Sequence, residues 1–153
     1  MLTEKIFGEK IQNVVYKERP SIYGIIIRNG EIGVIHINGK KGYFLPGGGK
    51  KEGETEIECL RREFIEETGF AINIGDNIDT VVEYSYCIQL NCYLKVIATF
   101  YFVDLGEKTK GKIEEDHNLV WVSPEIAINN MALTHHAWAI QKSLNILNYA
   151  LNK

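Results

Sequence analysis

The chain has 153 residues, of which 45% are hydrophobic and 24% are charged. This length and composition predict one domain over residues 1–153, large enough to bury a core. The net charge of −3 and the lack of a basic stripe argue against nucleic-acid polymers as partners. No apolar run reaches about 18 residues and no signal-peptide pattern opens the chain, so we expect a cytoplasmic protein outside the membrane.

The cysteines and histidines give no sign of a disulfide framework or a zinc site. Cys59, Cys87 and Cys92 are odd in number and lack a CxxC spacing, which predicts buried or inert free thiols. The four histidines also lack the spacing of metal ligands.

Short strands are predicted before residue 50. Their segments are rich in β-branched and aromatic residues and span 11–17, 21–28, 31–37 and 43–45. Asn29-Gly30 lies between the second and third segments and predicts a tight hairpin turn. The last segment leads to Pro46-Gly47-Gly48-Gly49, a predicted loop whose backbone can approach a ligand closely because its glycines have no Cβ.

A helix is predicted between Thr55 and Gly69. Thr55 has the position of an N-cap, and Glu58 three residues later completes a capping box. Gly69 followed by apolar Phe70 predicts a Schellman ending. The predicted core-facing stripe consists of apolar residues at helical spacing: Ile57, Leu60 and Phe64.

Three glutamates lie on one face of this helix. Glu63, Glu66 and Glu67 are spaced i, i+3 and i+4, so their side chains are neighbours and their charges repel. A bound cation would convert this repulsion into affinity, and clustered oxygen ligands suit Mg²⁺. The alternative is a solvated acidic helix, but such a helix would intersperse lysines among its acids.

The second half of the chain predicts more strands and two helices. The strand segments are 81–90, 93–105 and 119–122, with Asn91-Cys92 as a tight turn. Ser123 followed by Pro124 predicts the start of a helix. A last helix is predicted over 134–151, with one apolar face formed by Ala137, Ile140, Leu144, Leu147 and Leu151. These elements predict an α+β fold in which a mixed β-sheet lies between helices.

The segment 48–70, GGKKEGETEIECLRREFIEETGF, resembles the signature of the Nudix family at every fixed position. The matching residues are Gly48, Glu54, Arg62, Glu63, Phe64, Glu66, Glu67, Gly69 and Phe70. This resemblance implies the Nudix-type α/β/α sandwich. It also implies a hydrolase that cleaves the pyrophosphate bond of a nucleoside diphosphate linked to another group, with Mg²⁺ or Mn²⁺ as cofactor.

The resemblance also assigns site residues. Glu63, Glu66 and Glu67, with the backbone carbonyl of Gly48 or its neighbour, would hold the metal. Arg62 would orient Glu54 or one of the ligand glutamates. Glu54 would have a structural role and would not bind the metal itself.

The general base is less closely defined. Glu63 is one candidate, and the acidic run 114–116 is the other. The run resembles a stretch of many Nudix proteins in which a glutamate before a Trp-bearing strand reaches the metals, and its spacing to Trp121 selects Glu115 both as base and as metal ligand. The alternative interpretation of this run is a solvated acidic loop.

Four residues are candidates for substrate binding: Phe44, Lys50, Tyr86 and His135. Phe44 precedes the glycine loop, and Lys50 follows it closely enough to meet phosphates. For each type a structural interpretation stands beside the functional one. Aromatic residues on strands more often fill a core, lysines beside acids are usually surface groups, and the histidine could serve packing alone.

Two classes of function are compatible with the signature. The first is a MutT-like hydrolase of nucleoside triphosphates or 8-oxo-dGTP, with ADP-ribose and dinucleoside polyphosphates as alternative substrates. The second is a nucleotide sensor without turnover. Sensors of this kind usually lose signature glutamates, and all are present here, which favours catalysis. A homodimer is a further expectation from the resemblance.

Overall fold

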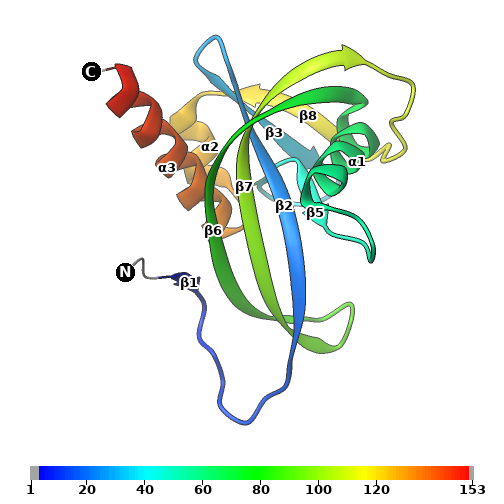
Figure 1. The fold of residues 1–153 in the computed structure, drawn as a ribbon, viewed down its shortest axis with the longest axis vertical. Coiled ribbons are helices and arrows are strands. Elements are labelled where there is room, and N and C mark those ends of the chain that lie inside the picture. The colour runs from blue at the N-terminus through cyan, green and yellow to red at the C-terminus, as the bar shows by residue number, and fades with distance from the viewer. Residues whose placement is uncertain (1–3, 152–153) are drawn as a thin grey trace.

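A computed structural model describes residues 4–151 (Figure 1). In chain order its elements are β1 (Lys5–Phe7), β2 (Tyr16–Arg28), β3 (Glu31–Ile37), β4 (Tyr43–Phe44), β5 (Gly47–Gly49), α1 (Glu56–Thr68), β6 (Phe70–Cys87), β7 (Cys92–Lys108), β8 (His117–Val122), α2 (Pro124–Asn130) and α3 (Thr134–Leu151). The strands form one mixed sheet in the order β1-β6-β7-β2-β3-β4, with β5 added to β2 and β8 added to β3. The pairs β1–β6 and β2–β7 are parallel.

Helices cover both faces of the sheet, as the sequence predicted. Ile22 and Ile26 of β2 pack with Leu60 and Phe64 of α1 in one cluster of buried side chains. Ile25, between them in sequence, belongs to a second cluster that includes residues of α2 and α3. Because successive side chains of a strand point to opposite faces, α1 lies on one face and α2 and α3 lie on the other, as Figure 1 also shows. The α/β/α sandwich is therefore confirmed.

The β2–β3 hairpin is confirmed, but the start of the chain differs from the prediction. Asn29 and Gly30 have φ angles of 52° and 78°, the left-handed values that a tight hairpin turn requires. Strand β2 begins at Tyr16 rather than at residue 21, and residues 11–15 form no strand. They contain a turn in which Asn13 has φ of 62°. Strand β1 was not predicted, and it is held by its parallel pairing with the distant β6.

The predicted glycine loop is in fact a short strand. Gly47–Gly49 pairs antiparallel with Ser21–Tyr23 of β2. Gly47 has φ of 140°, and a Cβ added to it would lie 2.1 Å from the carbonyl oxygen of Ile22. Only glycine allows this close approach, by which the glycine segment joins the sheet and contacts α1.

The predicted boundaries of α1 are confirmed in detail. Thr55 caps the helix and forms the full capping box with Glu58, and Gly69 has a left-handed φ of 82°. The ending is not of the Schellman type, because Gly69 N–H donates to the Ile65 carbonyl and Phe70 N–H donates to Thr68 Oγ1.

One residue of the predicted apolar stripe of α1 is misplaced. Ile57 is 38% exposed, whereas Leu60 and Phe64 are fully buried. Cys59, one position before Leu60, is instead buried in the same cluster as Leu60 and Phe64.

Strands β6 and β7 are longer than predicted, and the turn between them is shifted. β6 starts at Phe70, directly after the helix, and its first half contains polar residues and irregular pairing with β7. The turn occupies residues 88–91 rather than Asn91-Cys92. Cys92 instead lies in β7, where it is the register partner of Cys87.

The two C-terminal helices are confirmed, with a correction to the buried face of α3. Ser123 caps α2, and α3 has the predicted bounds. Ile140 is buried as predicted, but Leu147 is 36% exposed, and Leu151 lies outside the side chains that the structure describes. The most deeply buried polar residues of α3 are His135, His136 and Ser143. Among residues 4–151, no helix has the length and apolar character that crossing a bilayer requires.

Candidate active site

The glutamates of α1 lie at the edge of the core, where the helix meets β5. Glu67 is only 6% exposed, and the side chains of Glu63 and Glu66 are 16% and 21% exposed. The spacing along one helix therefore places all three carboxylates in a region with little water, where charges interact more strongly than at an open surface.

Glu67 is the most strongly perturbed of the three. One carboxylate oxygen, Oε1, accepts a hydrogen bond of 2.8 Å from Gly47 N–H. Burial, together with the charges of Glu63 and Glu114, raises the pKa of Glu67 to about 8, against the lowering effect of that hydrogen bond. Burial also raises the pKa of Glu63. Burial thus outweighs the contacts that favour the ionised forms, namely the hydrogen bond from Gly47 to Glu67 and the ion pair of Glu63 with Arg62.

Arg62 holds the neighbouring carboxylates in place. Its Nε and Nη2 atoms bind the two oxygens of Glu54 at 3.0 and 2.7 Å, and this contact lowers the pKa of Glu54 to about 2. Its Nη1 atom is 3.0 Å from Glu63 Oε1 and 3.1 Å from Glu66 Oε2. The structure thus contains the expected contact between Arg62 and Glu54. Arg62 donates to one oxygen of Glu63 and to one of Glu66, and no other basic side chain within residues 4–151 forms an ion pair with either glutamate.

Gly48 lies directly against this group. A Cβ added to Gly48 would be 2.7 Å from Glu63 Oε1, so no larger residue fits without moving the carboxylate. The carbonyl oxygen of Gly48, a predicted metal ligand, accepts a long contact of 3.6 Å from the Cys59 thiol.

The loop before β8 brings a second group of ligand atoms to the same place. Glu114, Asp116 and His117 each offer one such atom, and these atoms lie within 4.8 Å of one another. His117 Nε2 is 3.6 Å from Glu67 Oε2, and Glu114 N–H donates to the Glu66 carbonyl at 3.0 Å, which ties the loop to α1. The charge of Glu114 contributes to the raised pKa of Glu63 and of Glu67. Glu115 is exposed and lies outside this group.

The donor set suits a hard divalent cation. Carboxylate oxygens on α1 and in the loop before β8 are the ligands that Mg²⁺ and Mn²⁺ prefer. A cation at Glu67 would also relieve the unfavourable burial of its charge. His117 was missed by the sequence analysis, although its place at the end of an acidic run was a usable signal.

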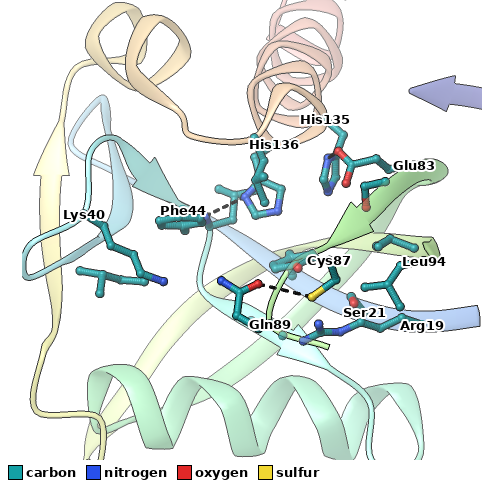
Figure 2. Close-up of a pocket in the computed structure, with 18 of the residues that line it drawn as sticks. Arg19, Ser21, Lys40, Phe44, Glu83, Cys87, Gln89, Leu94, His135 and His136 are labelled. Carbon is teal, nitrogen blue, oxygen red and sulfur yellow. Dashed lines mark hydrogen bonds and ion pairs between the residues drawn. The ribbon is translucent and has the colours of Figure 1, made fainter. Parts of the chain in front are cut away.

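A cavity of about 550 Å³ opens next to these acids (Figure 2). The wall of this cavity next to α1 includes the acid Glu67 together with Gly47, Gly48 and His117. Three of the predicted substrate-binding residues line it, namely Phe44, Tyr86 and His135, whereas Lys50 lines an adjoining cavity of about 610 Å³.

Two buried histidines and a glutamate form another part of the cavity wall (Figure 2). His136 Nδ1 accepts a hydrogen bond of 3.1 Å from Leu45 N–H, so its Nε2 carries the proton. This Nε2 is buried without a hydrogen-bond partner among the described residues. Burial lowers the pKa of His136 well below its ordinary value and keeps the ring neutral. His135 Nδ1 lies 2.9 Å from Glu83 Oε2, although the two are not aligned as a hydrogen bond.

Basic residues form the boundary between the two cavities. Arg19 and Lys40 line both of them, and Lys17 and Lys50 line the second. The Arg19 guanidinium lies against β5, because a Cβ added to Gly49 would be 3.0 Å from Arg19 Nε. The sequence analysis missed Arg19 and Glu83, since only the pairing of β2, β6 and β7 brings them together: both are register partners of Val96.

Comparisons with known proteins identify the family and the fold. A model of the NUDIX domain family matches residues 17–142. Among solved structures, the E. coli ORF135 protein is 21% identical, with a TM-score of 0.63 and coverage of 82% of this chain and 90% of that one. A MutT Nudix hydrolase from Burkholderia pseudomallei is 19% identical, with a TM-score of 0.64 and coverage of 82% and 98%. The MutT protein from Methanosarcina mazei Go1 is 23% identical, with a TM-score of 0.58 and coverage of 83% and 93%.

A search of curated protein sequences gave no significant match. The family model nevertheless spans more than half of the chain and includes the whole acidic helix. The chain therefore belongs to the Nudix family and is a Nudix-type hydrolase of pyrophosphate bonds.

Proposed function

We propose that this hydrolase cleaves the pyrophosphate bond of a small nucleoside di- or triphosphate derivative with the help of Mg²⁺ or Mn²⁺. The observation that carries the proposal is the position of Glu67. Its carboxylate is buried and lines a cavity of about 550 Å³, and among residues 4–151 its nearest ion-pair partner is His117, with Nε2 at 3.6 Å.

The residues present fit a divalent cation at this end of the cavity. Glu63, Glu66 and Glu67 would hold it, with Glu114 and the carbonyl of Gly48 as further donors. When bound, the cation would neutralise phosphate charge and lower the pKa of a bound water. Arg62 fixes one oxygen of Glu63 and one of Glu66, and Gly47 N–H fixes Glu67, so the ligands are oriented before any cation arrives.

The general base belongs to the acids beside this cradle. Glu114 is the candidate that the geometry favours, because its charge acts on Glu63 and Glu67. Glu115 stays a candidate from the spacing of the sequence. Replacing each by Gln separates them, because only the loss of the base should lower kcat by a large factor at saturating concentrations of the divalent cation.

The remainder of the cavity suits a nucleoside. Phe44 and Tyr86 offer aromatic surface, and His135, His136 and Glu83 offer hydrogen-bonding groups for the edge of a base. Arg19 and Lys40 offer positive charge to phosphates near β5. MutT-like hydrolysis of nucleoside triphosphates, including 8-oxo-dGTP, is therefore the leading assignment, and similar folds carry the name MutT.

A second candidate follows from the adjoining cavity. Lys17, Arg19, Lys40 and Lys50 surround about 610 Å³ of further space, which would accommodate the longer phosphate chain of a dinucleoside polyphosphate.

The test is a panel of nucleotides assayed with Mg²⁺ between pH 7 and pH 9. It should contain 8-oxo-dGTP, the ordinary dNTPs, ADP-ribose and diadenosine polyphosphates, with Glu67→Gln as the control for contaminating activity. We expect at least one substrate to be hydrolysed only with a divalent cation and only by the unaltered chain. Binding of nucleotides without turnover of any would instead support the sensor interpretation.

A further inference from the structure

Two of the three cysteines face each other at the end of the β6–β7 hairpin. Cys87 is the last residue of β6 and Cys92 is the first of β7, and the two are register partners. Directly opposed residues of an antiparallel pair have Cα atoms about 4.5–5.5 Å apart. A disulfide typically requires Cα atoms about 4.4–6.8 Å apart. The backbone of this hairpin therefore already has the separation that a disulfide needs.

The side chains of this pair also meet the requirement of direction. Opposed residues on neighbouring strands project from the same face of a sheet. Cys87 and Cys92 both pack at the edge of the cluster that α2 and α3 cover, which is the cavity face. Both are partly exposed, whereas Cys59 is fully buried on the other face. Cys87 and Cys92 are thus within reach of a small reagent, and Cys59 is not.

We infer that Cys87 and Cys92 form a reversible oxidation site for low-molecular-weight disulfides such as glutathione disulfide. The thiolate of one cysteine attacks the reagent's S–S bond, forms a mixed disulfide and releases one reagent thiol. The second cysteine then attacks its partner's sulfur, forms the Cys87–Cys92 bond and releases the second thiol. The two cysteine sulfurs are oxidised by two electrons, the reagent is reduced, and the two cysteine protons end on the released thiols.

The site is placed where its oxidation alters the cavity wall. Cys87 lines both cavities. Its Sγ donates to Gln89 Oε1 at 3.5 Å, a contact marked by a dashed line in Figure 2. Gln89 itself lines both cavities. A disulfide sulfur has no proton to donate, so oxidation removes the hydrogen bond from Cys87 to Gln89 at the hairpin end.

The experiment is equilibration of the purified, reduced chain with oxidised glutathione, followed by trapping of free thiols and mass spectrometry. Trypsin separates the cysteines, because Cys59 falls on peptide 52–61 and the pair falls together on peptide 63–95. We expect peptide 63–95 to lose about 2 Da, the mass of two hydrogens, and peptide 52–61 to carry the trapping label. This readout needs no substrate, so it is independent of the proposed function.

Variants make the outcome decisive. Cys59→Ser should keep the loss of about 2 Da, whereas Cys92→Ser should stop at the mixed disulfide, with a gain of about 305 Da on peptide 63–95. Reductant should reverse both products. Three trapped thiols in the unaltered chain after oxidation, a bond that includes Cys59, or disulfide-linked dimers on a non-reducing gel would each overturn the inference.

Discussion

The replacement Glu67→Gln tests the electrostatics of the site most directly. The amide oxygen of Gln can still accept the hydrogen bond from Gly47 N–H, but the side chain can no longer ionise. Burial raises the pKa of Glu67 from 4.5 to about 8. The folded chain therefore binds more protons at this position than the unfolded chain between those two values. Without a metal, its stability must fall as the pH rises through that range and level off above pH 8.

The magnitude follows from the difference in pKa. Between pH 4.5 and pH 7 the difference lowers the free energy of unfolding by about 3 kcal/mol. In a chain of this size that corresponds to roughly 6–12 °C in melting temperature, as an upper bound. Glu67→Gln removes this penalty, so the variant should melt above the unaltered chain at pH 8 when EDTA is present.

The assay is thermal unfolding in EDTA at intervals from pH 5 to pH 9, repeated with Mg²⁺ or Mn²⁺. The cations should raise the melting temperature of the unaltered chain most at high pH, because they compete with the proton for Glu67. They should raise that of Glu67→Gln much less. Glu52→Gln, an exposed residue, is the control for the loss of one charge. A pH dependence equal in Glu67→Gln and the unaltered chain would refute the reasoning.

Three further replacements test other parts of the site. Gly48→Ala should lower turnover by at least about tenfold while far-UV circular dichroism is unchanged, because its Cβ would meet Glu63 Oε1 at 2.7 Å. His136→Leu should destabilise the chain by about 1–3 kcal/mol in urea unfolding, because Leu45 N–H loses its buried acceptor. Arg19→Gln should raise KM by about tenfold with little change in kcat and weaken the salt dependence of KM, whereas Lys95→Gln, on the same sheet but outside both cavities, should not.

The helix limits and the hairpin turn could be predicted from the sequence, because each depends on residues that are close together in the chain. The limits of α1 follow from Thr55, Glu58 and Gly69, all within the helix or next to it, and the β2–β3 turn follows from Asn29-Gly30. The carboxylate face likewise needs only the helical repeat.

Long-range pairing determines the parts that were missed. Gly47–Gly49 becomes a strand only because β2 accepts it, and β1 exists only through β6. In the loop before β8, the backbone contact of Glu114 with Glu66 determines which acid approaches the helix. Sequence spacing alone pointed one residue further, to Glu115. The position of His136 in the cavity wall also depends on a long-range contact, because its Nδ1 accepts a hydrogen bond from Leu45 N–H, far away in the chain.

The charges of the site explain why proton and cation are alternative occupants. Arg62 and Glu54 form a bidentate pair whose charges cancel. The charges of Glu63, Glu66 and Glu67 are left without an equal positive charge. Arg62 also contacts Glu63 and Glu66, but its single charge is already balanced by Glu54. Three ionised carboxylates near Glu114 would leave a large uncompensated charge at the edge of a core. The metal-free chain lowers this charge by keeping the proton on Glu67, the most buried of the three. A divalent cation removes the reason for that proton, so its binding should release protons near neutral pH, and a calorimetric binding enthalpy that is the same in buffers of different ionisation heat would contradict this coupling.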